Sequence, residues 1–382
     1  MAVEPFHIHV SDEILDDLQY RLHHTRWPEQ LEDQGWERGT ELSFLKSLVA
    51  YWRDHYDWRA QEAWLNLFSQ FRCNIEGIDV HFVHERGKGP NPLPIILTHG
   101  WPDSYLRYQK IIPLLTDPAN HGGDPGDSFD VIVPSLPGFG FSGRANRPGV
   151  NNEYVSGIWA QLMTKELGYP KFAAAGGDMG SGVTRYLAAN HPELLTGIHL
   201  TDIGILRELL NSPDQTSLTE EELRYKKSAA KWISDEGGYM SIQSTRPQTL
   251  AYGLSDSPAG VAAWLVEKFR AWSGCGGDLF RCFSKDELLT HIMIYWVTNT
   301  IGSSAHMYYD NSHSLPPLGY IQVPTGVALF SQDVLLPPRQ WAERNLNITR
   351  WTSLPRGGHF AAMEEPELLA DELRSFFKAY RT

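Results

Sequence analysis

A run of small residues that ends in a glycine-flanked aspartate constrains the fold of this chain more than any other feature. Residues 173–182 read Ala-Ala-Ala-Gly-Gly-Asp-Met-Gly-Ser-Gly, and a helix-forming stretch follows from about Ser181. Glycines on both sides of one residue let two backbone segments approach closely, so a strand can turn sharply into a helix. Such a turn lifts the central side chain, here Asp178, above the sheet. We therefore expect an α/β core with a reactive group at the tip of this turn.

Short apolar runs before and after this turn are typical of strands buried in a sheet. They lie at residues 95–98, 131–133, 172–175, 198–200 and 327–330, and segments of helical character separate most of them. Buried strands that alternate with helices predict a mostly parallel sheet covered on both faces. A hairpin around Glu76-Gly77 is expected to join the strands at residues 71–75 and 80–83.

The pattern of strand and helix signals changes three times along the chain and predicts four regions. They are an N-terminal helical segment (1–70), a first part of the core (71–202), a helical cap (203–317) and a second part of the core (318–382). In the third region strand signals vanish, while helix formers, Trp and Tyr dominate. Helices are expected there at residues 220–234, 259–272 and 285–296. We interpret this region as an insertion into the sheet.

The balance of charges excludes several classes of partner. Lys and Arg number 33 against 46 Asp and Glu, which gives a net charge of -13. Nucleic acids and anionic membranes need a basic surface, so neither is an expected partner. No apolar run is long enough to span a bilayer and the first residues do not resemble a signal peptide, so we expect a cytoplasmic protein. The three cysteines are too few for a disulfide framework and lack zinc spacing.

A carboxylate at the tip of the turn narrows the chemistry. Asp178 is expected to be ionised at neutral pH, so it can attack a saturated carbon directly and form an alkyl ester. Epoxide opening and dehalogenation are the candidate reactions. Trp101, which follows the strand at residues 95–98, and Met179 are expected to supply two backbone N–H groups. This oxyanion hole would stabilise the charge that forms when water attacks the ester.

A base and an acid are expected farther along the chain. Among the 15 histidines, His359 is the best candidate base, because two glycines place it in a loop after the last strand. The order of nucleophile, acid and histidine requires an acid between Asp178 and His359. Asp333, which follows the strand at residues 327–330, fits this requirement, and Asp202 and Asp310 are the alternatives.

No cofactor or metal is expected. Residues 138–143 match the glycine pattern of dinucleotide sites, but no helix begins inside the motif, so a tight turn is the better interpretation. The chain contains no His-Glu-x-x-His motif and no cysteine pair at zinc spacing.

Five segments together resemble the microsomal-type epoxide hydrolases over nearly the whole chain. They are residues 51–58, 99–102, 176–181, 237–240 and 356–365. The resemblance implies an α/β-hydrolase fold with a helical cap, an N-terminal segment that wraps the core, and a small-molecule epoxide as substrate. It also implies two cap tyrosines that hydrogen-bond the epoxide oxygen, Tyr239 and either Tyr308 or its neighbour Tyr309. The chain is also similar to anchor-free bacterial enzymes of enediyne antibiotic pathways.

Two other functions are open at this point. A haloalkane or haloacid dehalogenase shares the aspartate nucleophile and the histidine base. That activity needs hydrogen-bond donors to the halide beside the nucleophile, and the Met179 side chain cannot act as such a donor. A non-catalytic ligand-binding protein of the same fold is the second. Aromatic residues in the cap suggest a bulky, partly aromatic substrate, and the expected contacts are Trp101, Pro102, Trp264 and Trp296. The sequence is compatible with a homodimer and does not decide the oligomeric state.

Overall fold

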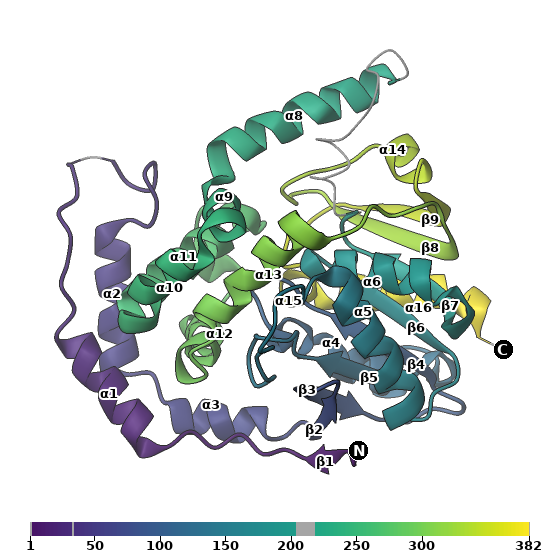
Figure 1. Cartoon of the computed structure of the whole chain (residues 1–382), viewed down its shortest axis with the longest axis horizontal. Coiled ribbons are helices and arrows are strands. Elements are labelled where there is room, and N and C mark those ends of the chain that lie inside the picture. The colour runs from purple at the N-terminus through teal and green to yellow at the C-terminus, as the bar shows by residue number, and fades with distance from the viewer. Residues whose placement is uncertain (1, 33, 204–217, 382) are drawn as a thin grey trace.

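A nine-stranded sheet forms the centre of the computed structural model, which describes residues 2–32, 34–203 and 218–381 (Figure 1). The strand order is β1-β2-β3-β5-β4-β6-β7-β8-β9. The strands are β1 (Glu4–Pro5), β2 (Gln70–Ile75), β3 (Ile78–Glu85), β4 (Leu93–Thr98), β5 (Phe129–Pro134), β6 (Phe172–Gly176), β7 (Leu195–Leu200), β8 (Ile321–Phe330) and β9 (Leu346–Leu354). Pairing is antiparallel from β1 to β5 and parallel from β5 to β9. The prediction of a mostly parallel sheet is therefore confirmed.

The hairpin between β2 and β3 also forms where the sequence predicts it. Glu76 and Gly77 connect the two strands, and both have positive φ angles, 52° and 84°. Two consecutive residues of this kind give a turn whose twist matches that of the strands on either side. The hairpin extends the parallel part of the sheet by antiparallel strands on one side.

Helices pack against the sheet, and most of them connect its parallel strands. They include α4 (Ile111–Thr116), α5 (Asn152–Gln161), α6 (Met179–Asn190) and α16 (Pro366–Phe377). Helix α5 packs against α6, and α4 packs against α16. The small residues of β6 allow α6 to start unusually close to the sheet. A Cβ atom on Gly180 would lie 1.9 Å from the carbonyl oxygen of Thr98, so only glycine fits there.

The described chain between β7 and β8 contains helices and no strand. These helices are α8 (Glu220–Glu236), α9 (Gly238–Thr245), α10 (Pro247–Asp256), α11 (Pro258–Trp272), α12 (Lys285–Val297) and α13 (Ile301–Ser314). Capping boxes at Thr219 and Ser284 begin α8 and α12, because each side chain bonds an otherwise free N–H group. The helices α9 to α13 gather on one side of the sheet (Figure 1). Residues 204–217, where the cap is expected to begin, lie outside the described residues.

The N-terminal segment, shown in purple in Figure 1, runs from the edge of the sheet to the cap helices. Its helices are α1 (Asp12–His23), α2 (Leu42–Asp54) and α3 (Trp58–Leu65). Arg21 pairs with Asp256 of α10 at 2.6 Å, and the Tyr51 hydroxyl donates to Asp286 of α12 at 2.9 Å. Trp52 is buried against α12. Among the residues described, no helix combines the length and the apolar character needed to cross a membrane.

Candidate active site

Asp178 occupies the sharp turn between β6 and α6. Its backbone has φ 56° and ψ -126°, a conformation that side chains other than glycine rarely adopt. Such a residue costs on the order of 1–3 kcal/mol and persists only where its surroundings hold it in place. Gly100 provides the space opposite, because a Cβ atom there would lie 2.3 Å from Oδ1 of Asp178. The turn that the sequence predicts is therefore present, with the carboxylate at its tip.

The Asp178 carboxylate has one amide donor and one imidazole beside it. The Trp101 N–H donates to Oδ1 at 2.9 Å, and Nε2 of His359 lies 3.4 Å from Oδ2. Met179 begins α6, where the first N–H groups have no partner within the helix. The two expected oxyanion donors thus lie next to the carboxylate, Trp101 in direct contact with it and Met179 as the next residue in the chain.

His359 lies in the loop after β9 and contacts an acid on its other nitrogen. Its Nδ1 is 3.0 Å from Oδ1 of Asp333, and both side chains are buried. Burial alone would lower the pKa of His359, but the carboxylates of Asp333 and Asp178 outweigh it and raise this pKa well above its ordinary value. The two carboxylates therefore favour the protonated imidazole.

The two alternative acids lie elsewhere. Asp310 is on α13, where its carboxylate accepts the N–H of Val150. Asp202 lies behind the turn, where its Oδ2 accepts the backbone N–H of Asp178 at 2.5 Å and the Ser181 hydroxyl at 3.0 Å. Burial raises the pKa of Asp202 to about 6. Asp333 is thus the candidate that hydrogen-bonds His359, whereas Asp202 supports the strained backbone of Asp178.

Two tyrosines of the cap face the nucleophile from above. Tyr239 on α9 stacks on Trp101 with ring centres 5.1 Å apart, and Tyr308 on α13 meets the same indole edge-on at 6.0 Å. The two phenol rings are 5.8 Å apart and nearly perpendicular. Burial raises the pKa of both phenols well above the ordinary value. Tyr309 instead stacks on His313 and is 39% exposed, so Tyr308 is the residue that faces the site.

Comparison with known proteins identifies the family. A model described as "Epoxide hydrolase N terminus" matches residues 3–108, and one described as "alpha/beta hydrolase fold" matches residues 94–234. A protein of Stigmatella aurantiaca whose name assigns it to the epoxide hydrolases is 45% identical, with 100% of this chain and 86% of the relative covered. Epoxide hydrolase 1 of Sus scrofa is 38% identical over 98% of this chain and 88% of its own length. The chain belongs to the epoxide hydrolase family.

Solved structures agree with this assignment. The juvenile hormone epoxide hydrolase of Bombyx mori superimposes with a TM-score of 0.86 at 30% identity, covering 100% of this chain and 94% of its own. The Aspergillus niger epoxide hydrolase has a TM-score of 0.86 at 28% identity and covers 100% and 97%. This epoxide hydrolase therefore has the α/β-hydrolase fold that the sequence resemblance implies.

The aromatic residues of this epoxide hydrolase are distributed differently from the expectation. Trp272, at the end of α11, lies 5.2 Å from the Tyr239 ring and 5.3 Å from that of His359, so it forms a wall of the site. Trp264 instead donates to Gln243, and Trp296 lies under the Arg21 guanidinium of the N-terminal segment. The structure does not bring these two indoles to the Asp178 site, whereas Trp101 and Pro102 are buried beside it.

A buried ion pair supports this epoxide hydrolase site and was not among the expected residues. Arg107 contacts Asp103 at 2.5 Å and also donates to the carbonyl oxygen of His359 at 2.5 Å. Asp103 in turn accepts the Gly100 N–H at 3.0 Å. The pair thus connects the loop that carries Trp101 to the loop that carries His359. Its four-residue spacing within Asp-Ser-Tyr-Leu-Arg is the one sequence signal for it.

Glu364 holds the histidine loop from the other side. Its carboxylate accepts the N–H groups of Gly358 at 3.0 Å, Phe360 at 2.9 Å and Gly274 at 2.6 Å. Glu364 therefore holds the position of His359 by bonding the residues before and after it.

Within residues 2–32, 34–203 and 218–381, no group of three or more His, Cys, Asp or Glu side chains could hold a metal ion.

Proposed function

We propose that this epoxide hydrolase converts an epoxide to a vicinal diol through a covalent ester on Asp178. The observation that carries the proposal is the position of this carboxylate, which lies between the Trp101 N–H and His359 and under the tyrosine pair. The amide holds Oδ1, so Oδ2 is the oxygen that attacks. It forms a bond to an epoxide carbon, and the bond between that carbon and the epoxide oxygen breaks.

The tyrosines supply the proton that the departing oxygen needs. The opened epoxide is an alkoxide, and a phenol is far more acidic than an alcohol, so Tyr239 or Tyr308 protonates it and becomes a phenolate. Because burial raises the pKa of both phenols, they are neutral donors before the reaction.

Ester formation prepares His359 for the second half-reaction. Once Asp178 is esterified, His359 loses one of the two carboxylates that raise its pKa. The imidazolium can then release its proton and restore the phenolate to phenol, which leaves a neutral base. This base removes a proton from water, and the resulting hydroxide attacks the ester carbonyl. Trp101 and Met179 stabilise the oxyanion, and the diol leaves as its oxygen takes the remaining proton from the Asp178 carboxyl.

The phenol pair favours an epoxide over a halide as the leaving group. An epoxide oxygen needs a proton, whereas a departing halide does not, so two phenols beside the nucleophile serve only the first reaction well. The aromatic walls, with Trp101 and Trp272, support a bulky apolar substrate. Relatives from Bombyx mori and Ctenocephalides felis are named juvenile hormone epoxide hydrolases. A role in enediyne-type biosynthesis stays a prediction that rests on sequence resemblance.

Trapping the ester tests the proposal. The His359→Gln variant should accumulate an adduct on the peptide that contains Asp178, with the mass of the added epoxide, because no base remains to activate water. His313→Gln, which changes an exposed histidine of α13, is the matched control and should turn over without an adduct. In a single turnover in heavy-oxygen water, the label should enter the Asp178 carboxylate. A label that enters only the diol, with no adduct from any epoxide, would contradict the covalent route.

A further inference from the structure

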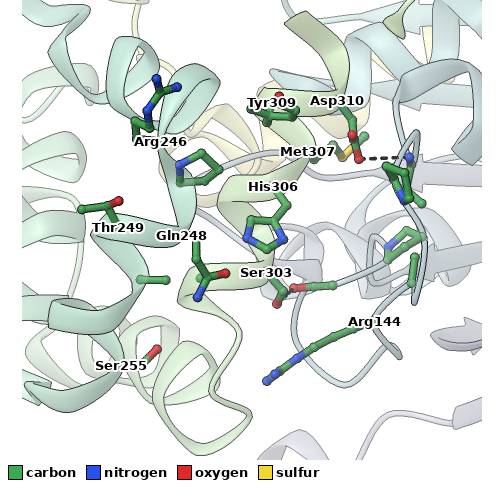
Figure 2. Close-up of a pocket in the computed structure, with 18 of the residues that line it drawn as sticks. Arg144, Arg246, Gln248, Thr249, Ser255, Ser303, His306, Met307, Tyr309 and Asp310 are labelled. Atoms are coloured by element: carbon green, nitrogen blue, oxygen red, sulfur yellow. Dashed lines mark hydrogen bonds between the residues drawn. The ribbon is translucent and has the colours of Figure 1, made fainter. Parts of the chain in front are cut away.

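A groove of about 1060 Å³ opens between the cap and the core on another side of α13 (Figure 2). Its walls are the core loop at residues 137–150, helix α10 and helix α13. None of the residues of the proposed reaction lines it. This groove is therefore a space separate from the Asp178 site.

Helix α13 divides the two spaces. Tyr308 contacts Trp101 and Tyr239, so its ring faces the reaction site. Ser303, His306 and Asp310 line the groove, and Figure 2 shows His306 at its centre. Their spacing of three and four residues places them on one face of the helix. A molecule in the groove would thus contact α13 without reaching the nucleophile.

The groove is rich in cations although the chain has a net charge of -13. Three arginines line it, Arg144, Arg147 and Arg246, and Arg147 has a carboxylate nearby, that of Glu76 at 3.6 Å. Arg246 donates to the carbonyl oxygen of Thr245, next to it in the chain. Within the described part of the chain, neither Arg246 nor Arg144 contacts a carboxylate.

The two acids of the groove are already engaged. Asp256 pairs with Arg21 at 2.6 Å, and Asp310 accepts the Val150 N–H at 3.0 Å, the dashed contact in Figure 2. Neither carboxylate contacts Arg144 or Arg246, and the three arginines outnumber the two acids that line the groove. Arg144 donates to the carbonyl oxygens of Thr298 and Asn299, which ties the core loop to the start of α13. Guanidinium groups of this kind bind carboxylate and phosphate through paired hydrogen bonds.

The first turn of α10 adds to the attraction for a negative charge. Arg246 precedes this helix and its side chain makes no capping hydrogen bond, while Gln248 and Thr249 of the first turn line the groove. Free N–H groups at a helix start carry partial positive charge. This feature adds to the effect of the arginines and would not define a site by itself.

The remaining wall is apolar and exposed. Tyr252 is 72% exposed and Tyr309 is 39% exposed, so both aromatic side chains are accessible to solvent. Pro137, Pro148 and Met307 continue this wall. An apolar wall next to Arg144 and Arg246, which contact no carboxylate within the described chain, suits a molecule with one acidic end and one apolar body.

From these observations we infer that the groove binds an amphipathic organic anion, with its carboxylate or phosphate at Arg246 and its apolar body along Tyr252 and Tyr309. Such a ligand would contact the cap helices and the core loop together. Because it binds the folded protein, it raises the melting temperature of the enzyme. The inference does not depend on the proposed reaction, since its site shares no residue with it.

Octanoate and octyl phosphate are the probes, and octanol is their neutral counterpart. Calorimetry and melting curves on the full chain should show binding and a higher Tm with either anion, and neither with octanol. The affinity should fall at least tenfold in Arg246→Ala and be largely kept in Arg246→Lys. Arg339→Ala, which changes an exposed arginine of α14 (Arg339–Glu343) outside the groove, should bind like the unchanged protein.

Three results would overturn the inference. They are no binding of either anion, equal stabilisation by octanol, and unchanged affinity in Arg246→Ala. Asp178→Asn separates the groove from the reaction site, because binding in the groove survives this change and binding beside the nucleophile is altered by it. A preference for octyl phosphate over octanoate, or the reverse, identifies the acidic group.

Discussion

Replacing Asp178 with asparagine should lower the pKa of His359. The amide has nearly the shape of the carboxylate and carries no charge, so it imitates the neutral ester of the proposed intermediate. Asparagine also tolerates the positive φ angle of this position better than most residues. Asp333 keeps its contact with Nδ1 at 3.0 Å, so the imidazole stays oriented. The variant therefore changes one charge and little else.

The size of the effect follows from the distance. His359 Nε2 lies 3.4 Å from Oδ2 of Asp178, and two unit charges that far apart attract by about 5 kcal/mol at an effective dielectric constant near 20. Loss of this attraction removes one of the two contributions that oppose the effect of burial. The pKa of His359 should therefore be lower in Asp178→Asn than in the unchanged protein, so that the imidazole becomes neutral at a lower pH.

Titration by NMR of the ring nitrogens of isotopically labelled histidine would measure this shift. Asp310→Asn is the matched control, because it removes a carboxylate of α13 that bonds Val150 and not His359. The control should leave the His359 titration unchanged. An identical midpoint in Asp178→Asn and the unchanged protein would refute the reasoning, since esterification could then not convert His359 from an acid to a base.

Three further predictions concern the residues around the site. Tyr308→Phe should lower kcat/KM for an epoxide by about 10²-fold through loss of a proton donor, whereas Tyr309→Phe, its exposed neighbour, should not change it. Burial raises the pKa of Asp202 from an ordinary 3.8 to about 6, so its carboxyl is harder to ionise in the folded protein than in the unfolded chain. The folded protein therefore loses stability as the pH rises through this range. The free energy of unfolding of Asp202→Asn relative to the unchanged protein should thus increase from pH 4 to pH 8, on the order of 3 kcal/mol, measured in urea. Arg107→Met should destabilise the fold by about 3–5 kcal/mol, because it leaves the Asp103 charge buried and unpaired, and Asp103→Asn in the same chain should recover part of this loss.

The strands and the turn could be predicted because their patterns are local. The apolar runs at residues 95–98, 131–133 and 172–175 are buried strands in the structure, and glycines at fixed positions mark the turn at Asp178. Each of these features depends on neighbours in the chain. The expected cap helices at residues 220–234, 259–272 and 285–296 were found for the same reason, within α8, α11 and α12.

The parts that depend on distant contacts could not be predicted in this way. Trp264 and Trp272 both lie on α11, and a helix buried on most of its surface does not indicate in sequence which ring faces a site. In sequence, Asp202 is a candidate acid for His359, because it follows a strand as Asp333 does. Only the pairing of β7 with β6 shows that its carboxylate bonds the N–H of Asp178. The strand β1, with two residues, has no pattern to detect.

The N-terminal segment has a mechanical consequence for substrate access. The chain connects the cap to the core next to β7 and β8, and helices α1 and α2 grip α10, α11 and α12 on the far side (Figure 1). The cap helices are therefore held on two sides, by their connections to the core and by their contacts with α1 and α2. The Asp178 side chain is 17% exposed, so we expect a substrate to reach it past individual side chains and loops, with the helices staying in place. Deletion of the N-terminal segment would remove the contacts that hold the cap helices on this side.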